Sequence, residues 1–195
     1  MIQNNTLQIL AISGSLRRGS FNTALLREAA NLAPTNMKIE LYQGLRDIPP
    51  YDEDQRAHGD PESVISLKRQ IAAADGLLIA TPEYNGSVPG VLKNAIDWVS
   101  RPPEPPLPGK VVAVVGASMS QFGTMRAQLH LQDILTAVGA LTMPAPAVLI
   151  GQAHERFTED GRLTDQTSRE FLTQLLTELA RWVRLWAEQK SPVGV

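Results

Sequence analysis

The stretch with the clearest chemical potential is SGSLRRGSFN, residues 13 to 22, which directly follows an apolar run. Its glycines let the backbone curl so that several N–H groups can converge on one anion. Its serines add hydroxyl donors, and its first arginine adds a permanent charge with a donor fork suited to phosphate. The residues concerned are Gly14, Ser15, Arg17, Gly19 and Ser20. A helix expected to start near Asn22 would add unpaired N–H groups and partial positive charge.

Other phosphate-loop patterns do not match this stretch. It contains no lysine, so GxxxxGK[ST] is absent, and Gly14 and Gly19 have no third glycine in step for GxGxxG. The phosphatase loop that also follows a first strand needs a cysteine nucleophile, and the chain has no cysteine. The loop is therefore interpreted as binding a phosphate without attacking it. The alternative is a serine-rich turn in which Ser20 or Asn22 caps the helix.

A second loop, in TPEYNGSVPGVLKNAIDW at residues 81 to 98, follows another apolar run. Asn85-Gly86 is a strong turn signal. Tyr84 supplies a flat aromatic face, and Glu83 is a lone carboxylate, for which a structural hydrogen-bonding role is preferred over a catalytic one. A phosphate loop beside such a segment suits a nucleotide-like ligand with one phosphate and a planar ring.

The elements that must position both loops alternate along the chain. Strands are expected at 7–13, 38–42, 76–81, 111–116 and 146–150. Helices are expected from Asn22 to before Pro34, at 61–74, from Pro89, at 124–138 and from near Thr164. Residues 43–60 are predicted to be a surface loop, and RPPEPPLPGK, at 101–110, a stiff connector. For the apolar stripe of the last helix, packing on the sheet is preferred over lying on a membrane surface.

This alternation predicts one α/β domain over residues 1–195, with five parallel strands and helices on both faces. In such doubly wound sheets, ligands bind at the carboxyl ends of the strands, which is where both loops emerge.

Composition restricts the function classes. The chain has 195 residues, a net charge of −2 and no cysteine, so disulfides, thiolate nucleophiles and Cys-ligated metals are excluded. The charge gives no reason to expect nucleic-acid binding. The opening residues MIQNNTLQ lack the features of a signal peptide, no apolar run is long enough to span a membrane, and a cytoplasmic protein is expected. His58, His130 and His154 show no ligand spacing, and no metal is predicted.

The segments GSLRRGSFN and PEYNGSVPGVLKNAIDW closely resemble the two signatures of the NADPH-dependent FMN reductase family, which is flavodoxin-like. The nearest branch is similar to the bacterial chromate and quinone reductases, and other branches include azoreductases. The resemblance covers most of the chain and is more specific for FMN than for substrate.

The resemblance implies the following FMN contacts. The phosphate would be held by Ser15, Arg17, Ser20, Phe21 and Asn22. The isoalloxazine would lie along Pro82, Glu83, Tyr84 and Asn85, with backbone N–H groups near Asn85 and Gly86 facing the charge of the reduced ring. Ala117 and Ser118 match a third contact, although Ser118 could instead cap a turn. Trp98 and Asp97 are assigned to the core and to tethering a neighbouring loop.

The resemblance also implies the chemistry. NADPH or NADH would pass a hydride to flavin N5 and leave, and a small acceptor such as a quinone, azo compound, chromate or free flavin would take its place in a ping-pong mechanism. No side chain is expected to be catalytic.

A third stretch, MRAQLHLQ at 125–132, resembles the helix of the chromate-reductase branch that takes part in subunit contacts. Arg126 and Gln128 match, whereas Leu129 and Gln132 replace a tyrosine and an arginine. A homodimer is therefore expected, with a homotetramer as the alternative. Two other functions stay open at this point: a flavodoxin-type electron carrier acting on partner proteins, and a non-redox module that binds another phosphate ligand.

Overall fold

The computed structural model describes residues 6–190, so residues 1–5, where no signal peptide is expected, lie outside the described part. The strands are β1 (Leu7–Ser13), β2 (Met37–Leu41), β3 (Gly76–Ala80), β4 (Val111–Ala117), β5 (Leu141–Thr142) and β6 (Val148–Ile150). The helices are α1 (Phe21–Leu32), the 3₁₀ helix η1 (Gly44–Asp47), α2 (Glu53–Ala57), α3 (Glu62–Ala73), α4 (Gly90–Val99), α5 (Met125–Ala137), α6 (Ala153–Arg156) and α7 (Gln166–Lys190).

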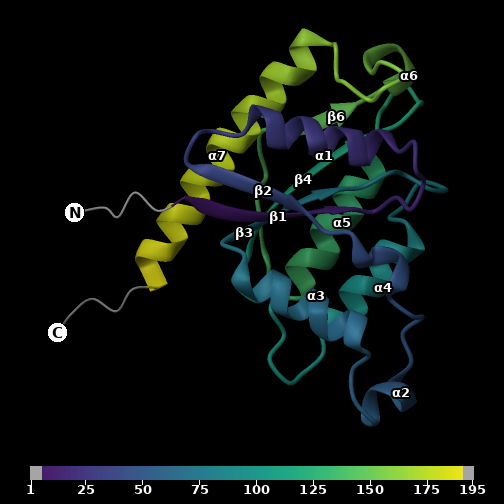
Figure 1. Cartoon of the computed structure of the whole chain (residues 1–195), viewed down its shortest axis with the longest axis vertical. Helices are drawn as coiled ribbons and strands as arrows, with labels where there is room; N and C mark the ends of the chain where they lie inside the picture. Colours follow the sequence, from purple (N-terminus) through teal and green to yellow (C-terminus); the bar gives the residue numbers. More distant parts are fainter. Residues whose placement is uncertain (1–5, 191–195) are drawn as a thin grey trace.

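The strands form one parallel sheet in the order β2-β1-β3-β4-β5, and β6 also pairs with β4 (Figure 1). This is the flavodoxin-like doubly wound arrangement, which confirms the predicted fold class. The reversal of strand order between β1 and β3 marks the edge where such sheets bind ligands. The two loops singled out in the sequence follow these two strands.

The predicted fifth strand is divided in the structure. β5 pairs with the start of β4 and β6 with its end, so both occupy one position in the sheet. Residues 143–147 between them contain Pro144 and Pro146, which cannot donate to a strand ladder. The prediction of a strand over 146–150 located β6 but missed β5, because two residues show no periodicity.

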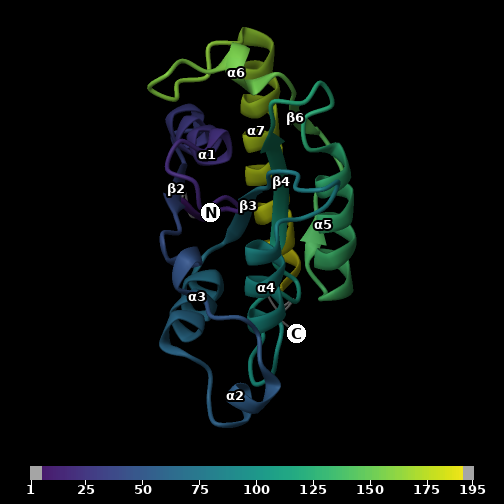
Figure 2. The ribbon, with the colours of Figure 1, turned by 90° about the vertical axis from the view of Figure 1, so that its right-hand side faces the viewer.

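Helices cover both faces of the sheet, α1 and α7 on one side and α3, α4 and α5 on the other (Figure 2). The alternation of β1 explains why both faces are apolar. Ile9 and Ala11 pack under α1 and α7, whereas Leu10 and Ile12 pack on the opposite side. The stripe of α7 is buried on the sheet, as predicted, at Leu172, Leu175, Leu176, Leu179 and Val183. No helix in residues 6–190 combines the length and apolar character needed to cross a bilayer.

The segment 43–60 is more ordered than a surface loop. It contains η1 and α2, and it buries Leu45 and Ile48 against the face covered by α3 and α4. The prediction of a loop was wrong here because helices this short carry no helical repeat that a sequence can reveal. The short helix α6 was missed for the same reason. The connector 101–110 has no regular structure, as expected.

Candidate functional site at the carboxyl edge of the sheet

The first loop leaves β1 and curls into the N-terminus of α1. The N–H of Gly14 donates to the carbonyl of Ala80 at 2.8 Å, which ties the loop to the end of β3. Ser20 is the N-cap of α1: its Oγ accepts from the N–H of Thr23 at 3.3 Å. Ser20, rather than Asn22, is therefore the capping residue. The start of the helix faces the loop, so its partial positive charge lies where an anion was expected.

Arg17 folds back over the same helix start. Its guanidinium donates to the carbonyl of Gly19 and lies 5.6 Å from the ring centroid of Phe21. Its N–H donates to Oγ of Ser15 at 3.4 Å. The side chain is exposed and forms no ion pair within residues 6–190, so its charge is available to a phosphate at the helix start.

Asn22 has a role that the sequence did not reveal. Its side chain is buried; Nδ2 donates to the carbonyl of Ala117 at 2.9 Å, and Oδ1 accepts from the N–H of Ala117 at 3.0 Å. This pair of bonds joins the start of α1 to the end of β4. A contact between Asn22 and a phosphate would therefore use the backbone N–H rather than the side-chain amide.

The second loop carries a tight turn at Tyr84–Ser87. Two backbone hydrogen bonds of 3.0 and 3.1 Å join Tyr84 and Ser87, and φ is 51° at Asn85 and 76° at Gly86. Positive φ at both central residues defines a type I′ turn, which Asn-Gly adopts with little strain. The N–H groups of Asn85 and Gly86 donate to no group among the residues described. The turn thus presents two free donors, and the half-exposed ring of Tyr84 lies beside them.

Glu83 has the structural role preferred from the sequence. Its Oε2 accepts from the N–H groups of Arg126 and Ala127 at 3.0 and 3.2 Å, and its Oε1 lies 3.7 Å from Nε of Arg126. The carboxylate thereby satisfies orphan donors in the first turn of α5, where negative charge is favoured. The adjacent Pro82 is buried. These contacts hold the second loop against the loop that follows β4.

In the third loop, Ser118 stabilises a turn. Its Oγ donates to the carbonyl of Gly123 at 2.8 Å and accepts from the N–H of Ser120 at 3.1 Å. The hydroxyl is therefore engaged within the loop, which supports the turn-capping alternative for this side chain. Directly before it, Gly116 allows β4 to approach α5, because a Cβ there would lie 1.9 Å from Oγ1 of Thr124.

Two neighbouring assignments have different outcomes. Trp98 is fully buried, as expected of a core residue, and its Nε1 donates to the carbonyl of Pro49 at 2.9 Å. The carboxylate of Asp97 does not tether a loop, because it pairs with Lys93 one turn earlier in α4, at 2.7 Å; only the backbone carbonyl of Asp97 contacts the connector, where it accepts from Nε of Arg101 at 3.2 Å. Asn94, which the sequence reasoning missed, makes the tether instead, because its amide bonds Tyr51 N–H and the carbonyl of Pro49.

The histidines are separate in the structure. His58 contacts the carbonyl of Asp54, His130 contacts Oγ of Ser87, and His154 lies near Glu155. Within residues 6–190, no three side chains of the metal-ligating types form a group that could hold a metal ion.

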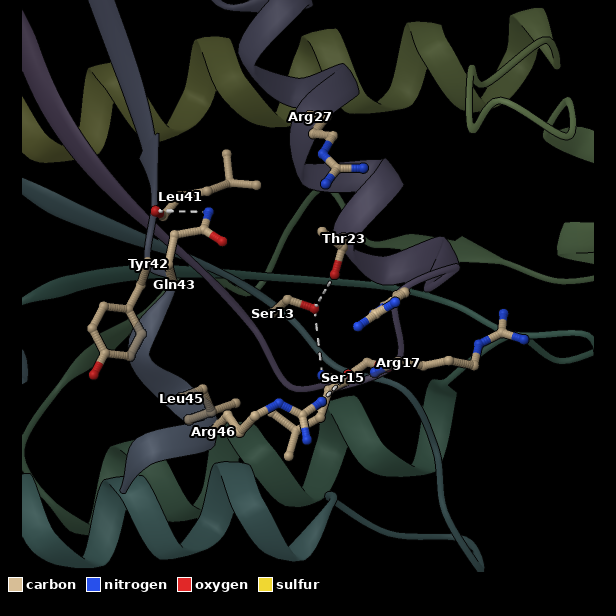
Figure 3. Close-up of a pocket in the computed structure, with 12 residues that line it drawn as sticks. Ser13, Ser15, Arg17, Thr23, Arg27, Leu41, Tyr42, Gln43, Leu45 and Arg46 are labelled. Carbon is tan, nitrogen blue, oxygen red and sulfur yellow. Dashed lines mark hydrogen bonds between the residues drawn. The ribbon is translucent and has the colours of Figure 1, made fainter. Parts of the chain in front are cut away.

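A cavity of about 190 Å³ adjoins the first loop on the side of β2 (Figure 3). Ser15 and Arg17 are the predicted site residues that line it. The guanidinium groups of Arg27, from α1, and Arg46, from η1, enter it from opposite sides (Figure 3). Tyr42 also lines it, and burial, followed by the charge of Asp47, raises the pKa of this phenol. Sequence reasoning missed Arg27 and Arg46, because only the fold brings residues so far apart in the chain together.

The residues present fit FMN. A helix start with serines and one unpaired arginine suits a single phosphate, and free N–H donors beside an aromatic ring at the same edge suit the polar rim of a flat ring system.

The comparisons with known proteins agree with this geometry. The family model for NADPH-dependent FMN reductase matches residues 7–155. An NAD(P)H-dependent FMN reductase of Pseudomonas aeruginosa is 50% identical over 93% of this chain and 97% of its own length. A quinone reductase of Escherichia coli is 42% identical over 91% of this chain and 96% of its own length.

Among solved structures, the flavoenzyme NAD(P)H:(acceptor) oxidoreductase FerB of Paracoccus denitrificans has a TM-score of 0.83. It is 36% identical, with 92% of this chain and 98% of FerB covered. These matches confirm the resemblance seen in the two sequence motifs, together with FMN and NAD(P)H as the expected redox cofactors. The chain belongs to the NADPH-dependent FMN reductase family and is an oxidoreductase of that family.

Proposed function

We propose that this reductase passes electrons from NAD(P)H to small acceptors by a ping-pong mechanism. Quinones are the leading acceptors, and azo compounds, chromate and free flavin are further ones. The observation that best supports this proposal is that two loops meet at one edge of the sheet. One forms a cradle suited to phosphate at the start of α1, and the other is a turn with two free N–H groups after β3. The whole chain is proposed to form one FMN-binding domain in the cytoplasm, where NAD(P)H is supplied.

The first loop would hold the phosphate end of the cofactor. Arg17 provides the charge, Ser15 and Ser20 provide hydroxyl groups, and the N–H groups at the start of α1, including those of Phe21 and Asn22, provide donors. Ser20 contributes while capping the helix, because its hydroxyl hydrogen remains available when Oγ accepts from Thr23. These contacts orient the cofactor and take no part in bond making.

The second loop would set the electronic environment of the ring. FMN supplies the redox chemistry when bound, accepting hydride from NAD(P)H and releasing electrons to an acceptor that replaces the nicotinamide. The N–H groups of Asn85 and Gly86 would donate to the polar rim, where negative charge develops on reduction. Pro82 fixes the entry to this loop, and Glu83 holds it against α5. Ser118 supports the third loop from within its turn.

A homodimer is proposed, with the partner covering an apolar surface beside this edge. We define the apolar surface as Tyr84, Met119, Phe122, Met125 and Leu129, all exposed large hydrophobic residues. The contacts of Glu83 with α5 place Tyr84 next to the first turns of that helix. Phe122 is 68% exposed, and side chains of this size gathered at one place are typical of protein interfaces. A second copy bound to this surface would cover the solvent-exposed side of the candidate site.

The decisive experiment is an absorption spectrum of the purified protein, with FMN added if needed, before and after anaerobic NADPH. The expected result is a protein-bound flavin band that bleaches with NADPH and returns when a quinone is added. The same protein with Arg17→Ala should bind FMN about tenfold or more weakly, through loss of a charged contact. Absence of bound flavin after FMN addition would refute the cofactor site. A band that bleaches only with dithionite would favour the electron-carrier alternative.

A further inference from the structure

The cavity beside the first loop is unusually basic. Four arginines line it: Arg17, Arg18, Arg27 and Arg46. Within residues 6–190 none of the four forms an ion pair. Seven of the nine other arginines there pair with carboxylates, as Arg56 does with Glu53, and Arg101 and Arg184 are the two that do not. The side chains of Arg18 and Arg27 also make no hydrogen bond to any described residue, and Arg46 donates to the carbonyl of Leu16 at 2.7 Å. We call this cavity the arginine pocket.

The arginine pocket has positive charges and no negative charge among its lining residues, which favours the binding of an anion. None of its twelve lining residues is acidic. Asp47 is the adjacent carboxylate; it acts on Tyr42, and it pairs with none of the four arginines. Oγ1 of Thr23 donates to Oγ of Ser13 at 2.9 Å, which places hydroxyl groups on the same wall. Four guanidinium groups around one cavity repel one another unless a counter-charge joins them, and their donor forks match phosphate oxygens.

The arginine pocket borders the proposed FMN phosphate position. Ser15 and Arg17 belong to both, whereas Arg18, Arg27 and Arg46 belong to the arginine pocket alone. Ser20, Phe21 and Asn22, which form the start of α1, do not line it. Its walls come from the first loop, from α1 and from the segment 41–46, which begins with the last residue of β2. The loops proposed for the flavin ring follow β3 and β4. Two strand spacings separate these positions, on the order of 10 Å across the sheet edge. An extended dinucleotide spans more than this distance.

Resting on the proposed function, we infer that the arginine pocket binds the 2′-phosphate of NADPH. With its nicotinamide at the ring, the coenzyme would run along the sheet edge past the first loop and place its adenosine end at β2. A cavity of about 190 Å³ accepts a phosphate and part of a ribose but not a whole nucleotide, which agrees with a subsite for one end of a larger ligand. NADH lacks this phosphate, so the pocket favours NADPH.

The test compares Arg27→Ala with the wild type, both loaded with FMN. Arg27 is suited to this test because its side chain lines the pocket and makes no hydrogen bond or ion pair with any described residue, so its removal should leave the fold intact. Affinities for adenosine 2′,5′-bisphosphate, AMP and inorganic phosphate are measured by titration calorimetry, and kcat/KM is measured with NADPH and NADH. Arg69→Ala on α3 is the matched control, because it removes the same charge from the opposite face of the sheet.

The expected result is that wild-type protein binds the bisphosphate more tightly than AMP. Arg27→Ala should lower the affinity for the bisphosphate and the kcat/KM for NADPH by about tenfold. The affinity for AMP and the kcat/KM for NADH should stay unchanged. Arg27→Lys should recover part of the effect, and Arg69→Ala should show none.

Three outcomes would overturn the inference. One is an equal effect on NADPH and NADH, or no effect on either. Another is weaker FMN binding in Arg27→Ala, which would assign the arginine pocket to the flavin phosphate. The third is inorganic phosphate binding as tightly as the bisphosphate, which would indicate a site for free anions. Failure of the proposed function itself looks different: the wild type would then bind no flavin or oxidise neither coenzyme, while the calorimetry would still decide about the bisphosphate.

Discussion

The buried side chain of Asn22 connects two segments that the sequence separates widely. It satisfies both the N–H and the carbonyl of Ala117, at the point where β4 passes into the third loop. Because both residues are buried, removing the Asn22 amide leaves the N–H and the carbonyl of Ala117 without these hydrogen bonds. The position of the first loop relative to the third therefore depends on this one amide.

Asn22→Ala should lower the free energy of unfolding by about 1–3 kcal/mol, the cost of leaving buried polar groups unsatisfied. FMN affinity should fall as well, because the start of α1 is no longer fixed to β4. Urea unfolding and flavin titration measure the two effects. Asn31→Ala near the end of α1 is the control, since its amide contacts only Glu28 at 3.4 Å and it should change little. Unchanged stability in Asn22→Ala would contradict this role.

Glu83 acts on the first turn of α5 through two hydrogen bonds. Glu83→Ala should cost about 1 kcal/mol of stability, as loss of a helix cap does, and should weaken FMN binding by loosening the second loop. Glu83→Gln keeps an acceptor oxygen and should retain most of both. Chemical unfolding and flavin titration of the two variants make the comparison. If Gln abolished turnover while stability and FMN affinity stayed normal, a catalytic role for the carboxylate would be indicated instead.

At the scale of elements, helix termini and turns determine where the site forms. The start of α1, the type I′ turn and the start of α5 meet because Glu83 and Asn22 join their loops. The long helix α7 also has a defined start. Oδ2 of Asp165 accepts from the N–H of Ser168 at 2.8 Å and lies 3.1 Å from Nη1 of Arg156. The hydrogen bonds from Ser168, followed by the charge of Arg156, lower the pKa of Asp165.

Asp165 should make stability depend on pH in the acid range. A folded-state pKa below the unfolded value contributes stability above the unfolded pKa of about 4, and this contribution is lost as pH falls through the folded pKa. Asp165→Asn keeps a cap but removes the titration, so its stability should fall less steeply between neutral pH and acid than that of the wild type. Asp165→Ala should lose about 1 kcal/mol at neutral pH. Thermal unfolding across pH measures these slopes, and parallel slopes would contradict the assignment.

At the scale of the whole molecule, the apolar surface lies beside the candidate site, at the edge where the flavin would be open. Covering it with a second copy would both bury these side chains and limit the access of water and acceptors. Assembly and activity should therefore change together.

Phe122→Glu should dissociate the proposed dimer, because a charge buried at an interface without a partner costs several kcal/mol. Light scattering on a size-exclusion column should show a halved mass, with weaker FMN binding. Phe171→Glu is the matched control: Phe171 is also exposed, at 47%, but lies on α7 outside the apolar surface, and its variant should remain dimeric. A wild-type protein that elutes as a monomer would refute the dimer.

The sequence by itself determined the doubly wound fold and the two loops of the site. Continuous apolar runs predict parallel strands that are covered on both faces, and glycine, serine and Asn-Gly patterns predict loops and turns. Both patterns depend only on residues that are close in the chain, so a single sequence reveals them. The five main strand positions and Ser20 as a candidate cap of α1 were predictable for this reason. So was the structural role of Glu83, although its partners were not.

Only the tertiary structure decided what lies next to what. The side chain of Asn22 bonds Ala117, and the arginine pocket unites α1 with η1, because strand order brings together residues that are distant in the chain. No local pattern carries that information. The division of the fifth strand into β5 and β6 and the short helices in 43–60 were equally beyond reach, since segments of two to five residues show no periodicity and are fixed by the neighbours they pack against.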